Sequence, residues 1–93
     1  MRIYAARVAS RGINVNCIVP GVTKTDAWTR LSQMRGLGDD PTEMMKGVIE
    51  RGMPLKKVVD PMDIGNLVKF LCTDSGKYMT GLVIPFDGGR HLK

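Results

Sequence analysis

The side chains in this chain best suited to metal binding or redox chemistry are two cysteines and one histidine: Cys17, Cys72 and His91. The cysteines lie far apart without a C-x-x-C pair, and each falls in an apolar segment, as is typical of a small buried hydrophobe. His91 lies close to the C-terminal end with no second ligand near it in the sequence, whereas a zinc site needs several. We therefore predict no metal site and no structural disulfide.

Basic residues outnumber acidic ones, 14 to 9, and give a net charge of +5 that raises the question of nucleic-acid binding. A phosphate-binding surface needs Lys and Arg gathered on one face, preferably beside aromatic side chains that stack on bases. Here the longest basic run is the pair Lys56-Lys57, and aromatic residues make up only 5% of the chain. This scattered pattern argues against a nucleic-acid partner.

The length of 93 residues fits one small domain, and its 43% hydrophobic and 25% charged residues are an ordinary globular composition. A domain of this size buries only about 60–65% of its unfolded surface, so its margin of stability is small. No apolar stretch approaches the roughly 20 residues that span a bilayer, and the N-terminal residues lack the layout of a signal peptide. We expect a soluble, cytoplasmic protein with no membrane partner.

The elements that must position any functional group alternate between helices and strands. A helix over 1–10 ends at Gly12 and has no capping residue at its start, as though it began within a longer helix. The run 13–19 predicts a strand, buried on both faces toward its end, that stops at Pro20-Gly21. A second short strand covers 82–86. Strands alternating with helices indicate a parallel α/β sheet.

Three further helices are expected between the two strands. The first covers 26–34 and is closed by Gly36-Leu37-Gly38. The second begins at Asp40-Pro41 and ends near Gly52, because Asp is a good N-cap and Pro suits the first helical position. The third begins with the same signature at Asp60-Pro61. Its apolar residues share one face: Ile64, Leu67, Val68 and Leu71.

Two short motifs, separated by that last helix, carry more information than the composition. The first is 12–16 (GINVN), which leads to Pro20-Gly21 and then Thr25. The second is Thr80-Gly81, followed by the short strand and by 87–89 (DGG). In this order, with DPMDI and FL in the helix between them, the motifs resemble the C-terminal part of the short-chain dehydrogenase/reductase family. The stretches MRIYA and KYMTG are most similar, within that family, to the NAD-dependent branch that includes carveol-dehydrogenase-like enzymes.

The resemblance implies an α/β fold that is the C-terminal fragment of a Rossmann-like, doubly wound parallel sheet. Residues 1–93 would form a single partial domain, with 26–59 as a substrate-lid-like excursion. The implied activity is that of an NAD(P)-dependent oxidoreductase, which moves hydride between nicotinamide and an alcohol or ketone carbon. The implied partners are NAD or NADP, a small alcohol or ketone, and further copies of the chain in a homo-oligomer. Neither the substrate nor the choice between the two dinucleotides can be read from these residues.

The cofactor residues that the resemblance implies lie in the turn after the first strand: Pro20, Gly21, Val22, Thr23 and Thr25. Pro20 and Gly21 would shape the turn, and Asn16 would support it through structural hydrogen bonds. The backbone of Thr23 would pair with the carboxamide of the nicotinamide, although the family usually has Ile or Val there. The hydroxyl of Thr25 would add a hydrogen bond, but the same residue taken alone is typical of a helix cap.

The excursion would cover the substrate, with these side chains as lining residues: Trp28, Leu31, Met34 and Met45. Methionine is frequent here, and it fills irregular core gaps as well as it lines adaptable pockets. A substrate-facing lid and a loose core patch therefore both remain open. Trp28 taken alone is also more typical of packing than of substrate contact.

The parts of the family that perform its chemistry have no match in this chain. Gly36-Leu37-Gly38 is not the pyrophosphate-binding turn, because no strand precedes it. The catalytic Tyr-x-x-x-Lys pattern fails for both tyrosines, since Tyr4 pairs with Val8 and Tyr78 with Leu82 at that spacing. We therefore expect no catalytic residue and no turnover by the chain alone. Whether Met1 is a true start or an internal residue cannot be read from the sequence.

An alternative function is a non-catalytic interaction module that associates with itself or with full-length dehydrogenase subunits. Two strands do not readily form a stable sheet, and the apolar faces of the first strand require neighbours. Unpaired edges with apolar faces favour self-association, so we expect no well-behaved isolated monomer.

Overall fold

The computed structural model describes residues 1–92, and its elements follow the predicted alternation of helices and strands. The α-helices and strands are α1 (Arg2–Val8), β1 (Cys17–Pro20), α2 (Asp26–Met34), α3 (Thr42–Gly52), α4 (Pro61–Leu71) and β2 (Val83–Phe86). Three short 3₁₀ helices cover Ala9–Arg11, Asp74–Gly76 and Arg90–Leu92. The predicted α/β class with a parallel sheet is confirmed.

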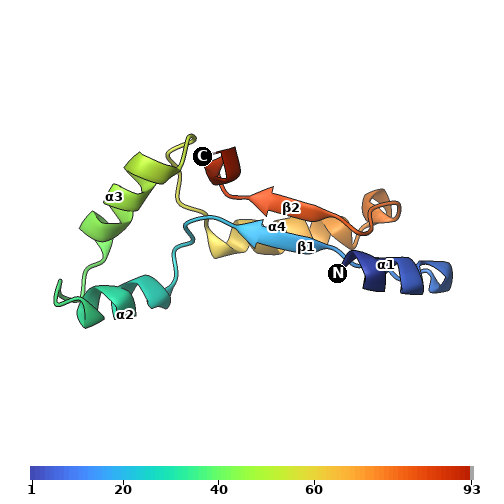
Figure 1. The fold of residues 1–93 in the computed structure, drawn as a ribbon, viewed down its shortest axis with the longest axis horizontal. Coiled ribbons are helices and arrows are strands. Elements are labelled where there is room, and N and C mark those ends of the chain that lie inside the picture. The colour runs from blue at the N-terminus through green and yellow to red at the C-terminus, as the bar shows by residue number, and fades with distance from the viewer. Residues whose placement is uncertain (93) are drawn as a thin grey trace.

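The two strands lie side by side and run parallel, with Cys17 opposite Val83 and Pro20 opposite Phe86. Figure 1 shows α4 running along the strands, α1 beyond their starts, and α2 and α3 beyond their carboxyl ends. The molecule is elongated, 51 × 24 × 23 Å. Its radius of gyration is 16.5 Å, against about 12 Å for a compact chain of this length. The excursion 26–59 therefore extends past the sheet instead of packing on it.

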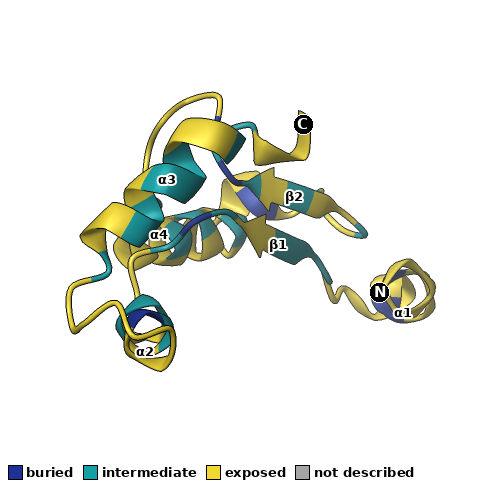
Figure 2. Cartoon of the chain, turned by 60° about the vertical axis from the view of Figure 1, so that its left-hand side comes forward, coloured by how far each residue is buried: buried dark blue, intermediate teal, exposed yellow. Residues whose placement is uncertain are grey.

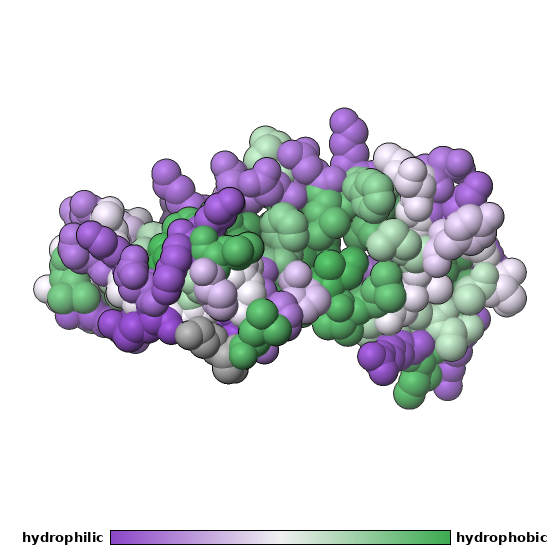
Figure 3. All heavy atoms as spheres, turned by 90° about the horizontal axis from the view of Figure 1, so that it is seen from above, coloured by the Kyte–Doolittle hydropathy of each residue, from purple (hydrophilic) through white to green (hydrophobic). Residues whose placement is uncertain are grey.

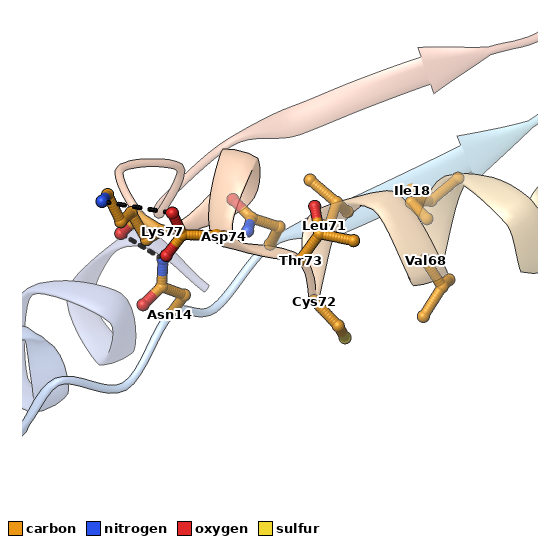
Figure 4. A pocket seen from close by; sticks show the side chains of 9 residues that line it. Asn14, Ile18, Val68, Leu71, Cys72, Thr73, Asp74 and Lys77 are labelled. Atoms are coloured by element: carbon orange, nitrogen blue, oxygen red, sulfur yellow. Dashed lines mark hydrogen bonds and ion pairs between the residues drawn. The ribbon is translucent and has the colours of Figure 1, made fainter.

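One face of the sheet is covered by α4, and the other lies open. Ile18 faces α4, since it lines a groove together with Val68 and Leu71 of that helix (Figure 4). Because side chains alternate along a strand, Val19 and Val83 lie on the opposite face, where they are 44% and 50% exposed. The prediction that the first strand is buried on both faces is therefore wrong for residues 1–92, which supply no cover for this face.

Two asparagines join the start of β1 to the connection before β2. The Asn14 amide donates to the carbonyls of Lys77 and Met79, at 3.0 and 2.9 Å. The Asn16 amide donates to Met79 at 2.9 Å, and its oxygen accepts from the Leu82 N–H at 3.1 Å. Asn16 thus makes structural hydrogen bonds at the start of β1, and the expectation that it supports the turn after the strand was wrong. These bonds also explain why β1 begins at Cys17 and not at Ile13.

The predicted helix ends agree closely with the structure, because each follows from a local interaction. The Asp60 carboxylate accepts from the Met62 N–H at 2.8 Å and caps α4. Gly12 adopts the left-handed conformation, φ 75°, at the end of the first helical segment. Helix α3 begins at Thr42, and Asp40 accepts hydrogen bonds from the hydroxyl and the N–H of that residue. These bonds, the hydroxyl's first, lower the pKa of Asp40.

Few side chains are fully buried, as Figure 2 shows. The buried hydrophobic residues form two groups, Ala5 and Val8 on α1, and Val22 and Met53 near the carboxyl ends of the strands. No helix within residues 1–92 has the length and apolar character required to cross a bilayer.

We predict that Asn16→Ala lowers the free energy of unfolding by about 1–2 kcal/mol, because the Met79 carbonyl and the Leu82 N–H lose their hydrogen-bond partner. Chemical denaturation of the chain in its native association state measures this. Asn66→Ala, at an exposed position of α4, is the matched control and should change stability by less than about 0.5 kcal/mol. Equal effects of the two substitutions would show that the Asn16 bonds add nothing to stability.

Candidate functional site

The turn after β1 extends the strand pairing by one residue and then approaches the C-terminal turn very closely. The Gly21 N–H donates to the Phe86 carbonyl at 3.1 Å. A Cβ placed on Gly21 would lie only 2.7 Å from the Cα of Asp87 and 3.0 Å from its carbonyl oxygen. Any side chain here would therefore push two backbones apart, which explains the glycine. Pro20, the last residue of β1, is exposed on the strand side of this turn.

Residues Val22 to Lys24 pair with the segment that returns from the excursion. The Val59 N–H donates to the Val22 carbonyl at 2.7 Å, and the Lys24 N–H donates to the Val59 carbonyl at 3.0 Å. Val22 is only 2% exposed, so its side chain packs inside the fold, and cofactor contact by this residue stays a prediction. In a parallel ladder, the backbone N–H and C=O groups of successive residues point to alternate sides. The bonds to Val59 come from Val22 and Lys24, so the N–H and C=O of Thr23 point away from Val59. Within residues 1–92 they make no backbone hydrogen bond.

Thr25 stands at the position before α2, in an extended conformation with φ −137° and ψ 165°. This is the N-cap position expected if Thr25 serves only as a helix cap. Its hydroxyl, however, makes no capping hydrogen bond to the helix. Thr25 is exposed and lines a groove between α2 and α3, so its hydroxyl is available to a ligand. The Thr23 hydroxyl differs, because it donates to the Gly21 carbonyl at 3.0 Å and stiffens the turn.

The groove beside Thr25 has a volume of about 880 Å³ and a mixed lining. Its apolar residues are Pro41, Met45, Ile49 and Val58. Of the four predicted lid residues, Met45 lines this groove. Trp28 and Leu31 are half-buried in α2, and Met34 is 83% exposed; none of these three is among its lining residues. Substrate contact by the four side chains stays a prediction.

The C-terminal turn is held by an aspartate whose carboxylate is fully engaged. Asp87 is 7% exposed and accepts from the N–H groups of Gly89 and His91, each at 3.0 Å. The His91 Nδ1 lies 2.9 Å from the same carboxylate. The imidazole hydrogen bond is the main reason that the pKa of Asp87 lies below its usual value, and burial opposes the shift. From the sequence, His91 was considered only as a metal ligand, although its spacing of one helical turn from Asp87 was a signal for this contact.

The other chemically distinctive side chains do not converge on this site. Tyr4 and Tyr78 are 62% and 87% exposed, and α1, which carries Tyr4, lies at the opposite end of the molecule from α2 and α3 (Figure 1). Cys17 is half-buried and Cys72 exposed, and neither forms a disulfide. No group of three or more His, Cys, Asp or Glu that could hold a metal occurs within residues 1–92.

Comparisons with known proteins place almost the whole chain within one group of enzymes. Residues 1–91 match the family model described as enoyl-(acyl carrier protein) reductase. The oxidoreductase UcpA of Salmonella typhimurium is 36% identical over 92 residues, which cover 95% of this chain and 33% of UcpA. The 3-oxoacyl-[acyl-carrier-protein] reductase FabG of Staphylococcus epidermidis is 39% identical over 88 residues, covering 95% of this chain and 32% of FabG. The chain thus spans about a third of the length of the curated relatives it matches.

Solved structures agree with the sequence relatives. A short chain dehydrogenase family protein from Francisella tularensis has a TM-score of 0.83 and 31% identity, covering 99% of this chain and 38% of that one. L-sorbose reductase from Gluconobacter frateurii, solved with NADPH and L-sorbose, has a TM-score of 0.84 and 28% identity, over 96% of this chain and 35% of that one. The narrower similarity to carveol-dehydrogenase-like enzymes stays a prediction.

We predict that Gly21→Ala destabilises the fold by about 1–3 kcal/mol, because the added methyl group meets the Asp87 backbone. Gly65→Ala in α4 is the matched control, since a Cβ there meets nothing within 4 Å. That control should stabilise the chain by about 0.5–1 kcal/mol through helix propensity. Denaturant titration of both variants measures the difference, and equal stabilities would refute the close approach.

Proposed function

This chain belongs to the short-chain dehydrogenase/reductase family, and on that ground we propose that it serves as the C-terminal part of an NAD(P)-dependent oxidoreductase. The reaction would move hydride between the nicotinamide ring and an alcohol or ketone carbon. Residues 20–25 would hold the nicotinamide end of NAD or NADP, and 26–59 would cover the substrate. The proton donor and the pyrophosphate-binding turn are not among these residues, so we expect no turnover by the chain alone.

The observation that carries the proposal is the backbone of Thr23. Its N–H and C=O have no backbone partner within residues 1–92 and sit at the carboxyl end of two parallel strands. In open α/β sheets, ligands bind in the crevice outside these strand ends. A carboxamide offers one donor group and one acceptor, which complement a free C=O and N–H on one residue. Because this contact uses only the backbone, Thr at this position is compatible with it.

The Thr25 hydroxyl would add the second contact to the nicotinamide carboxamide. It is exposed, uncommitted to the cap of α2, and close in sequence to Thr23. The groove that it lines extends between α2 and α3, where a substrate would lie beside the reactive face of the ring. We therefore propose that the turn binds the cofactor and that the excursion covers the substrate.

The substrate class follows from the names of relatives and is proposed only at that level. The relatives include a diacetyl reductase and a 3-oxoacyl-[acyl-carrier-protein] reductase, and the structural neighbours include an L-sorbose reductase. All three names describe reduction of a carbonyl group. We propose a small alcohol or ketone as the substrate, and a cytoplasmic location without nucleic-acid or membrane partners.

We predict that the endogenous polypeptide, immunopurified with antibodies to residues 60–93, oxidises NADH or NADPH in the presence of small ketones such as diacetyl. In that preparation, Thr25→Val should raise the KM for the dinucleotide about fivefold, because one hydrogen bond worth about 1 kcal/mol is lost. Thr23→Val should have a smaller effect, since the proposed contact is through the backbone and only the bond from the hydroxyl to Gly21 is lost. An endogenous band at 10.2 kDa would contradict the proposal that these residues are part of a larger oxidoreductase, because no turnover is expected from the chain alone.

A second candidate function is association with further copies of the chain, and the exposed surface supports it. The accessible area is 6826 Å², whereas a compact folded protein of this mass exposes about 5,300 Å². The excess, about 1,500 Å², is larger than the roughly 800 Å² that each partner buries in a standard protein interface. Figure 3 shows apolar residues gathered over the middle of the molecule, between more hydrophilic ends. Val19, Leu82 and Val83 are among the exposed apolar side chains of the sheet region.

We predict that the purified chain sediments above its monomer mass of 10.2 kDa. Val83→Lys should shift it toward the monomer, because a charge on the open sheet face opposes burial of that face. Met34→Lys, at an 83% exposed position of α2, is the control and should leave the mass unchanged. A 10.2 kDa monomer with a cooperative thermal transition would exclude self-association.

A further inference from the structure

The excursion 26–59 returns to the sheet through a short segment, 53–59, that is fastened at two points. The first is the pairing of Val59 with Val22 and Lys24, described above. The second lies at the other end of the segment, where the Leu55 N–H donates to the Gly88 carbonyl at 2.9 Å. Met53 is completely buried beside this bond. The return segment is thus held against both the cofactor-side turn and the C-terminal turn.

The contact between the return segment and the C-terminal turn is close-packed. A Cβ on Gly88 would lie 3.0 Å from the Met53 methyl carbon, and one on Gly89 would lie 3.2 Å from the Pro54 ring. Both glycines have positive φ, 63° and 90°, which other residues rarely adopt. The backbone of Gly88 and Gly89 therefore packs directly against Met53 and Pro54, with no side chain between them.

The return segment is also strained at its middle. Lys56 has φ 53°, and it is the only non-glycine residue of the described chain, 1–92, with a positive φ. Such a conformation persists where surrounding contacts enforce it. The contacts that hold it are the Leu55–Gly88 bond, the bond from the Lys56 N–H to the Met53 carbonyl, 2.9 Å, and the bond from the Lys56 ammonium to the Glu50 carbonyl.

We infer that Asp87, with His91, is a positioning residue that sets where the excursion re-enters the fold relative to the cofactor-side turn. Its backbone abuts Gly21, while its carboxylate fixes the Gly88-Gly89 turn through the N–H groups of Gly89 and His91. One rigid turn therefore touches both the proposed nicotinamide turn and the end of the proposed lid. The lid function rests on the proposed oxidoreductase role, but the mechanical coupling does not.

Hydrogen exchange of the full chain, measured by mass spectrometry without dinucleotide, tests the coupling. Asp87→Asn replaces one acceptor oxygen by a donor, so at least one of the Gly89 and His91 N–H groups loses its partner. We expect exchange in 53–59 to rise about tenfold while exchange in β1 and β2 stays unchanged. Asp74→Asn is the matched control, because that side chain is 93% exposed. Asp74→Asn should leave both regions unchanged.

Two results would overturn the inference. One is unchanged exchange in 53–59 after Asp87→Asn, and the other is an equal rise in the strands, which a merely structural role would produce. If Asp87→Asn does not fold, His91→Gln keeps the backbone bonds and removes the imidazole, and a smaller rise confined to 53–59 is then expected. Unchanged exchange in His91→Gln would overturn the inference as well. Because no cofactor is added, failure here is distinguishable from failure of the oxidoreductase proposal.

Discussion

The close approach of two backbones, at Gly21 and Asp87, is the constraint on which the rest of the structure depends. It is possible because β1 and β2 run parallel and end at the same level, with Pro20 opposite Phe86. From this contact the chain extends in two directions, into the proposed cofactor turn and into the turn that receives Met53. The best-buried hydrophobic residues outside α1, Val22 and Met53, lie beside it. The end of the sheet that is proposed to bind the cofactor is therefore also its most tightly packed part.

Away from that contact the fold is open, and this openness lowers the stability of the isolated chain. Helix α4 covers one face of the sheet, the other face exposes apolar side chains, and α2 and α3 extend past the strand ends. A sheet of two strands lacks the neighbours that give larger sheets their stability. The same surfaces that weaken the chain as an isolated unit are those that further copies, or the remaining two thirds of its relatives' fold, would cover.

In the proposed site, one threonine would bind the cofactor through its backbone and another through its side chain. Thr23 would act through its N–H and C=O, so its side chain is free to stiffen the turn through Gly21. Thr25 would act through its hydroxyl, and the excursion supplies a groove of mixed polarity whose side chains are not diagnostic of one substrate. A turn that acts through its backbone would suit a common cofactor, while the mixed lining of the groove in the excursion leaves the choice of substrate open.

The sequence by itself determined the features that depend on neighbours along the chain. Asp60-Pro61 capped α4, Gly12 ended the first helical segment, and the breaker pair Pro20-Gly21 ended β1, because caps and turns are local interactions. Only the tertiary structure decided which groups meet across long separations. It placed Asn16 against Leu82, opened one face of β1 to solvent, brought Met45 alone of the four predicted liners into the groove, and placed Asp87 against Gly21. These outcomes depend on strand register and on the path of the excursion, and no short stretch of sequence encodes either.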